Sequence, residues 1–228
     1  MQVVYEDNHV IIVSKQSGEI VQGDKTGDEP LVETVKRYIK EKYQKPGAVF
    51  LGVVHRLDRP VSGLVVFART SKALARLNKM FAEGEVHKTY WAIVIRGEKG
   101  LERGEWRELT HWLTRNEQQN KSYAYDHEVP RSKKAMLRYR IIANGERYDL
   151  VEVQLMTGRH HQIRCQLAKA GHPIRGDLKY GAPRSNPDGS ISLLSRKVEF
   201  VHPVSKETIS VEAPLPHDSL WQALAADL

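Results

Sequence analysis

Short apolar runs separated by polar turns fill the first third of the chain and predict alternating strands and helices. The segment VVYEDNHVIIVSK, residues 3–15, holds two apolar runs around a polar turn, which predicts two strands. A Gly- and Asp-rich loop follows, and from Leu31 apolar side chains recur every four residues, at Val35 and Ile39, as on one face of a helix. Residues 53–67 then predict a strand, a loop and a second strand.

The middle of the chain continues with a helix, a strand and a long loop. The segment TSKALARLNKMFAEG puts Leu74, Leu77 and Phe81 on one helical face and ends in a glycine, a common helix stop. Residues 87–97 alternate their apolar side chains, which is typical of a strand. We expect the polar residues 97–134 to be irregular.

The last part of the chain predicts mainly antiparallel strands. Residues 135–142 and 148–158 have the pattern of a hairpin, and residues 160–171 predict a short helix with Ile163 and Leu167 facing the core. The remaining elements are strands over residues 192–203 and 207–214 and an amphipathic C-terminal segment over residues 219–227. We therefore expect one α+β domain over residues 1–228, with a mixed, mostly antiparallel sheet and a few flanking helices.

The composition adds a basic character and excludes two structural classes. Lys and Arg outnumber Asp and Glu by 35 to 28, a net charge of +7, which favours a polyanionic partner. The single cysteine, Cys165, rules out an internal disulfide and cysteine-based zinc sites, and its apolar helical context predicts a buried thiol. The sequence shows no secretory signal and no apolar run of membrane length, so we expect a cytoplasmic protein.

Several common catalytic motifs do not occur in the sequence. It contains no Gly-rich phosphate-binding loop, no dinucleotide fingerprint, no HExxH and no GxSxG, so nucleotide, metalloprotease and serine-hydrolase chemistry have no support. The adjacent His160 and His161 would point about 100° apart in a helix, which does not suit one metal ion. We therefore expect neither a cofactor nor a metal.

Three segments concentrate residues that can carry chemistry. In HRLDRPVSGL, residues 55–64, Asp58 and Ser62 could simply stabilise a turn, but the segment holds more special residues than a turn needs. In HKTYWAIV, Tyr90 could be an ordinary packed strand residue. The third segment is TGRHHQIRCQLAKAGHPIRGDLKYG, residues 157–181. Its basic side chains could simply be solvated on the surface of a helix and a loop. Alternatively, they could contact RNA phosphates, with rings nearby that stack on bases.

Together these segments resemble, in order and spacing, the motifs of the RluA-type pseudouridine synthases. The resemblance rests on YEDNHVIIVSK, HRLDRPVSGLVVFA, KTY and TGRHHQIR…GHPIRGDLKYG, and it extends from about Val3 to beyond Gly181. Two features depart from the family pattern. Pro60 and Val61 stand where relatives often carry an acidic residue and Thr, and CQLA follows HQIR where a His is common. Both departures concern the grip on the target loop rather than the nucleophile.

The resemblance implies a role for each matching residue. Asp58 would be the nucleophile, and Arg56 would take the place of the flipped-out base in the RNA helix. Tyr90 would stack under the target base, and Ile163 would line the pocket. Arg164, which the helical pattern turns partly inward, would pair with Asp58. The residues expected to contact RNA are Arg56, Arg159, His160, Lys88 and Arg175.

The chemistry of such an enzyme fits these residue types. Converting uridine to pseudouridine breaks a C–N glycosidic bond and forms a C–C bond, so nothing is oxidised and no cofactor is needed. A carboxylate serves as nucleophile or ion stabiliser, as in retaining glycoside chemistry. Burial would raise the pKa of that carboxylate, and a guanidinium partner would lower the pKa again.

The resemblance also implies a fold and a partner. The expected fold is a largely antiparallel sheet with helices around it, split by a basic cleft that holds RNA. Because the first motif begins near Val3, we expect the compact branch without an N-terminal RNA-binding domain, acting as a monomer on RNA and not on DNA or membranes. Its substrate would be a stem-loop in 23S ribosomal RNA, in transfer RNA or in both, with residues 97–134 as a candidate for specificity.

Two other function classes remain open from the residues alone. A non-catalytic RNA-binding protein could use the same basic surface, but it would have no need for Asp58. A nucleobase-excising glycosidase would need a second carboxylate, and a nuclease would need a metal cluster. Asp177 is a distant candidate for such a second carboxylate.

Overall fold

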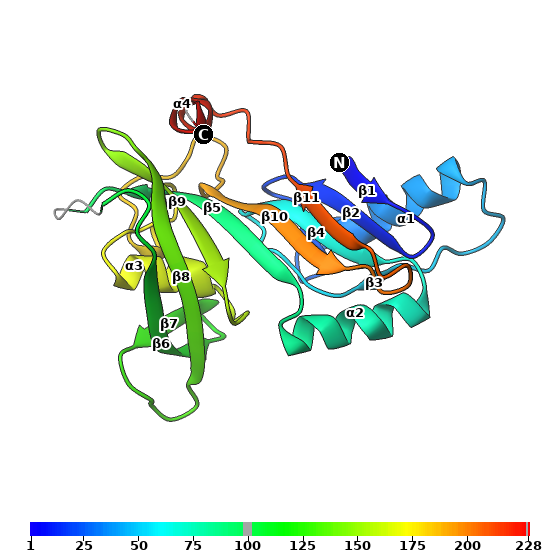
Figure 1. Cartoon of the computed structure of the whole chain (residues 1–228), viewed down its shortest axis with the longest axis horizontal. Coiled ribbons are helices and arrows are strands. Elements are labelled where there is room, and N and C mark those ends of the chain that lie inside the picture. Colours follow the sequence, from blue (N-terminus) through cyan, green and yellow to red (C-terminus); the bar gives the residue numbers. More distant parts are fainter. Residues whose placement is uncertain (98–101, 227) are drawn as a thin grey trace. The chain divides into compact units, whose positions relative to one another are not determined.

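The structure, a computed structural model, describes residues 1–97, 102–226 and 228 and divides the chain into two compact units (Figure 1). Unit 1 comprises Met1–His87 and Ser195–Pro214, and unit 2 comprises Lys88–Leu194 and Leu215–Leu228. Each unit contains strands, helices and a buried apolar core. In the part of the chain that the structure describes, no helix is long and apolar enough to cross a membrane.

Unit 1 is built on a sheet in the order β1-β2-β4-β10, with β11 added to β10 and β3 added to β4. The pairs β1–β2, β2–β4, β3–β4 and β10–β11 are all antiparallel. The strands are β1 (Gln2–Glu6), β2 (Val10–Lys15), β3 (Gly52–Val53), β4 (Ser62–Ala68), β10 (Leu193–Val201) and β11 (Thr208–Glu212), and the helices are α1 (Leu31–Lys42) and α2 (Ser71–Glu83).

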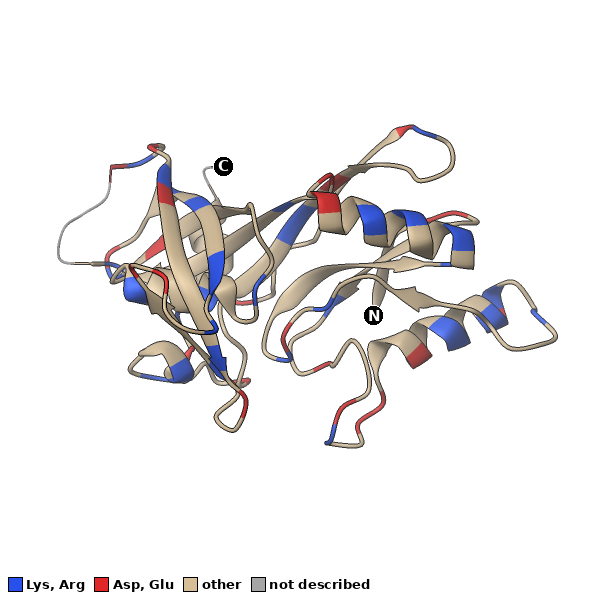
Figure 2. Ribbon diagram, turned by 90° about the horizontal axis from the view of Figure 1, so that it is seen from below, with Lys and Arg blue, Asp and Glu red and all other residues tan. Residues whose placement is uncertain are grey.

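The central strands of unit 1 are buried on both faces. Every residue of β2 is buried, because α1 and α2 cover opposite faces of the sheet (Figure 2). The Thr70 hydroxyl caps α2 by accepting from the Ala73 amide at 3.1 Å, and a left-handed glycine ends the helix. The predicted apolar face of α2 is partly wrong. Only Leu77 of the predicted side chains is fully buried, beside Ala73 and Met80, whereas Leu74 and Phe81 are half-buried.

Unit 2 contains a meandering antiparallel sheet in the order β5-β9-β8-β6-β7. The predicted hairpin and the short helix are confirmed, and the amphipathic C-terminal segment forms a helix. The elements are β5 (His87–Ile95), β6 (Arg107–Asn116), β7 (Lys121–Tyr125), β8 (Lys133–Asn144), β9 (Tyr148–Leu155), α3 (Gln162–Lys169), α4 (Ser219–Ala225) and the 3-10 helix η1 (Leu178–Tyr180).

The predicted loop over residues 97–134 is wrong where β6 and β7 lie within it. His111 and Leu113 point into the core, and their strand neighbours carry polar or aromatic side chains that face solvent. With so few aliphatic residues on the buried side, the two-residue period of the strands is hidden in the sequence. Residues 98–101 of this segment lie outside the described residues.

Gly63 is the point where the chain enters β4 with no room for a side chain. Its φ is +112°, and an added Cβ would lie 2.3 Å from the carbonyl oxygen of Ser195 in β10. A left-handed backbone and a close approach to a neighbouring strand both require glycine here.

We expect Gly63→Ala to lower the free energy of unfolding by about 3 kcal/mol, since strain and overlap act together. Urea denaturation followed by circular dichroism measures this change. Gly27→Ala is the matched control, because Gly27 also has a positive φ, +77°, but nothing lies within 4 Å of its added Cβ. Equal losses in the two variants would show that the contact with Ser195 is unimportant.

Candidate active site

Asp58 lies in the loop that joins β3 to β4 and is half-buried. The loop begins with His55, whose Nε2 accepts a hydrogen bond from the Val66 amide at 2.9 Å. The His55 ring also stacks on Phe81 of α2, with centroids 4.9 Å apart and an interplanar angle of 22°. His55 therefore ties the start of the loop to β4 and α2, within unit 1.

The end of the same loop is held through its backbone carbonyls by Lys15, the last residue of β2. The Lys15 side chain is fully buried, and its ammonium donates to the carbonyls of Gln16 at 3.0 Å, Arg59 at 3.0 Å and Val61 at 2.6 Å. Three N–H donors thus meet three carbonyl acceptors. The Asp58 carbonyl accepts from the Val61 amide at 3.0 Å, which closes a turn directly after the candidate nucleophile.

Burial lowers the pKa of Lys15 to about 8, while the negative charges of Glu19 and Asp58 favour its ammonium form. The ammonium and the Asp58 carboxylate therefore stabilise each other electrostatically. Lys15 was not among the residues predicted for the site. Lysine normally lies at the surface, and the signals in the sequence are that Lys15 ends the segment YEDNHVIIVSK and lies two residues after an apolar run.

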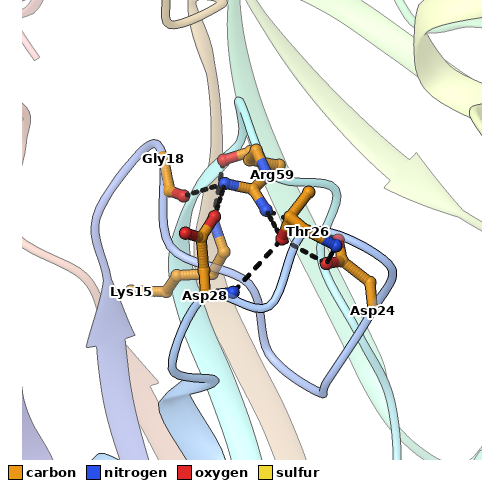
Figure 3. Close-up of polar contacts among 6 residues, drawn as sticks. All are labelled: Lys15, Gly18, Asp24, Thr26, Asp28 and Arg59. Carbon is orange, nitrogen blue, oxygen red and sulfur yellow. Dashed lines mark hydrogen bonds and ion pairs between the residues drawn. The ribbon is translucent and has the colours of Figure 1, made fainter.

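Arg59, the neighbour of Asp58, is bound by the loop of residues 23–29 (Figure 3). Its guanidinium donates to Asp28 at 2.7 Å, to the Thr26 hydroxyl at 2.8 Å and to Asp24 at 3.4 Å. The carbonyl of Arg59 accepts from the Gly18 amide at 2.8 Å. The guanidinium next to Asp58 in the sequence is thus engaged by two other carboxylates of unit 1.

In unit 2, Arg164 forms a buried, bidentate ion pair with Asp177. Its Nε donates to Oδ2 at 2.7 Å and its Nη2 to Oδ1 at 2.9 Å, and the two side chains are only 6% and 1% exposed. Removing one member of such a buried pair typically costs about 3–5 kcal/mol. The inward orientation predicted for Arg164 is confirmed, and Asp177 supplies a carboxylate to it.

Tyr180 extends this pair into a buried polar network. Its ring lies beside the Arg164 guanidinium, 5.1 Å from the centroid, and its hydroxyl accepts from the Ser122 amide at 2.8 Å. The same hydroxyl is 2.9 Å from Nδ1 of His161. Burial and the nearby Arg164 lower the pKa of His161 to about 2, so this imidazole is neutral.

The expected divergence of His160 and His161 is wrong. His161 precedes α3 in a left-handed conformation, φ 53°, so the two residues do not follow helical geometry. Their rings stack with centroids 3.8 Å apart at 20°. His160 also lies 2.9 Å from the Ser122 hydroxyl, so both rings are packed against β7. Within residues 1–97, 102–226 and 228, no three His, Cys, Asp or Glu side chains are grouped so as to hold a metal ion.

The other predicted pocket residues are also in unit 2. Tyr90 of β5 and Ile163 of α3 are buried, and Tyr90 lies opposite Val153 of β9. Burial lowers the pKa of Lys88, which is half-buried on β5. The buried thiol predicted for Cys165 is confirmed, and burial raises its pKa to about 11.

The residues predicted to contact RNA differ in their exposure. Arg56 of unit 1 is exposed, and Arg159 of unit 2 is exposed with its Nε donating to the Lys134 carbonyl at 3.1 Å. Arg175 is half-buried and pairs with Asp218, the N-cap of α4, at 2.8 Å. Asp58 and Arg56 belong to unit 1 and the other predicted site residues to unit 2, so the Asp58–Arg164 pair remains a prediction.

Comparison with known sequences shows the family of the chain. The family model described as RNA pseudouridylate synthase matches residues 9–169. A ribosomal large subunit pseudouridine synthase C of Vibrio cholerae is 31% identical over 93% of this chain, which spans 65% of that relative's length. A tRNA pseudouridine synthase C of the same organism is 30% identical and is covered over 95% of its length by the whole chain.

The fold has a close match among solved structures. The structure titled human RNA pseudouridylate synthase domain containing 4 aligns with a TM-score of 0.77 at 19% identity, covering 96% of this chain and 90% of that one. The α+β pseudouridine synthase fold expected from the sequence is thereby confirmed.

We expect Lys15→Met to destabilise the protein by about 3 kcal/mol, because it leaves the buried carbonyl of Val61 and the carbonyls of Gln16 and Arg59 without this donor. The midpoint of urea denaturation reports the loss. Lys79→Met in α2 is the control, since the Lys79 side chain is 73% exposed and its replacement should change stability by about 0.5 kcal/mol or less. A Lys15→Met midpoint equal to that of the control would contradict the proposed anchoring of the loop.

Proposed function

The chain belongs to the RNA pseudouridylate synthase family, and on that premise we propose that it isomerises uridine in RNA with Asp58 as the nucleophile. The supporting observation is the way the loop of Asp58 is anchored. His55 ties down its start, and Lys15 gathers the carbonyls at its end. Such anchoring fixes one carboxylate in place, which covalent catalysis requires.

The isomerisation needs no oxidant and no transferred group. The bond from C1′ to N1 of uridine breaks, the base turns, and C1′ bonds to C5. C5 then loses its proton, and N1 gains one, so atoms and charge balance. Attack of Asp58 on the sugar, attack on the base and assistance of an elimination are the three ways in which its carboxylate can serve.

The buried residues of unit 2 would complete the site. Tyr90 would stack under the detached base while it turns, Ile163 would line the pocket, and Arg164 would hold Asp58 ionised. The burial of all three side chains, each 6% exposed or less, supports these roles. Asp177 accepts hydrogen bonds from Nε and Nη2 of Arg164. The third guanidinium nitrogen, Nη1, is therefore the one directed away from Asp177.

RNA would be held by basic side chains around this site. Arg56 would fill the gap left by the flipped base, while Arg159, His160, Lys88 and Arg175 would contact the backbone. The positive charge of the chain supports a polyanionic partner. The names of the relatives favour catalysis over the alternative of a non-catalytic RNA-binding protein.

We propose a stem-loop of large-subunit ribosomal RNA or of transfer RNA as the substrate, modified by a cytoplasmic monomer. The two relatives compared above carry names for these two RNA classes. Pseudouridine maps of total RNA from cells with and without the gene should differ at one or a few uridines in these RNAs. Identical maps would contradict this substrate assignment.

We expect Asp58→Asn to bind RNA as the unchanged protein does but to release no tritium from RNA labelled at C5 of uridine, because the amide is not a nucleophile. The decrease in rate should be at least about 1,000-fold. Asp188→Asn is the matched control, since Asp188 lies on an exposed loop and an amide there can still accept from Ser190. Normal tritium release by Asp58→Asn would refute the proposed nucleophile.

A further inference from the structure

The sheet of unit 2 has one face that is rich in aromatic and basic side chains. Residues opposite each other in antiparallel strands point to the same side. Tyr125 lies opposite Trp112, and Trp112 lies opposite Lys134, so these three share one face across β7, β6 and β8. We call this the outer face, and its members are Glu108, Thr110, Trp112, Thr114 and Asn116 of β6, Lys121, Tyr123 and Tyr125 of β7, and Lys134, Met136, Arg138 and Arg140 of β8.

The other face of the same strands is the buried one. Leu113 and Ala135 point into the core, where they pack with Cys165 of α3 and with Tyr180. No member of the outer face is buried, and Tyr123 and Tyr125 are 38% and 37% exposed. The outer face therefore points away from α3 and towards solvent.

Cations lie directly beside the aromatic rings on this side of the sheet. The Lys121 ammonium is 5.5 Å from the centroid of the Tyr123 ring. Trp106, just before β6, has the guanidinium groups of Arg138 and Arg140 at 4.6 and 4.7 Å from its ring centroid. The outer face has four cations, and the carboxylates of Glu108 and Glu152 lie opposite two of them, Arg138 and Arg140. The Lys121 ammonium thus lies beside Tyr123 and equally close, 5.5 Å, to the ring of Tyr180, and Lys134 lies opposite Trp112.

We propose that the outer face of unit 2 binds single-stranded RNA next to the modified stem-loop, as a second RNA-binding surface. Trp112, Tyr123 and Tyr125 stack on bases, and Lys121 and Lys134 neutralise phosphates. A sheet that presents rings flanked by cations suits RNA, since every base has an aromatic face. Protein interfaces are also rich in Tyr, Trp, Met and Arg but poor in Lys, so Lys121 and Lys134 are the members of the face that favour RNA over a protein partner. The inference rests on the proposed function only in taking RNA as the partner.

The test measures binding of a uridine-free RNA of twelve adenines and cytosines by fluorescence anisotropy, which does not depend on catalysis. We expect the double variant Tyr123→Ala/Tyr125→Ala to bind this RNA at least about tenfold more weakly. Tyr43→Ala is the matched control, because Tyr43 is a 43% exposed tyrosine of unit 1 that lies beside Arg69. The control should bind as the unchanged protein does. Circular dichroism checks that both variants are folded.

A second measurement tests the role of the lysines. We expect Lys121→Gln/Lys134→Gln to reduce the slope of log affinity against log salt by about 1.4, since each phosphate contact on a single strand contributes about 0.7. Unchanged affinity in the tyrosine variant would overturn the proposal. A dimer in sedimentation experiments that the tyrosine variant abolishes would also overturn it, by assigning the face to self-association. If tritium release failed in the unchanged protein while this RNA still bound, only the proposed function would be lost.

Discussion

The burial of one ammonium group is the constraint on which the loop of Asp58 depends. Lys15 is buried at the end of β2. Its ammonium is solvated by three backbone carbonyls instead of by water. A buried charge is tolerated only when its hydrogen bonds are made. The loop must therefore fold so that the carbonyls of Arg59 and Val61 converge on Lys15, and this shape leaves the Asp58 side chain half-buried beside the ammonium.

Much of the fold could be predicted because its core is patterned. The apolar runs of β2 and β4 and the four-residue spacing in α1 come directly from burial, and the structure confirms these elements. The hairpin of β6 and β7 could not be predicted in the same way. Its buried side carries His111, Ser122 and small residues, and its other side carries rings and long polar chains, so the usual alternation is absent.

Site residues could be predicted only where the residues that carry the chemistry lie together in one short segment of the sequence. A short dense motif marks Asp58, and a basic segment marks Arg164. The ion pair of Arg164 with Asp177 and the hydrogen bonds of Tyr180 arise when separate segments pack together, and nothing local in the sequence encodes them. The left-handed backbone at His161 likewise results from tertiary packing, because histidine has no strong preference for it.

The alternation of β8 separates two kinds of surface on a single strand. Leu137 and Tyr139 belong to the interior, while Arg138 and Arg140 belong to the outer face. Substitutions on one side therefore leave the packing of the other side intact, whereas a one-residue insertion would exchange the two sets. The strand lets the outer surface diversify between lineages by point mutation while the interior stays under purifying selection. Changes of length, by contrast, should be rare in this part of the family.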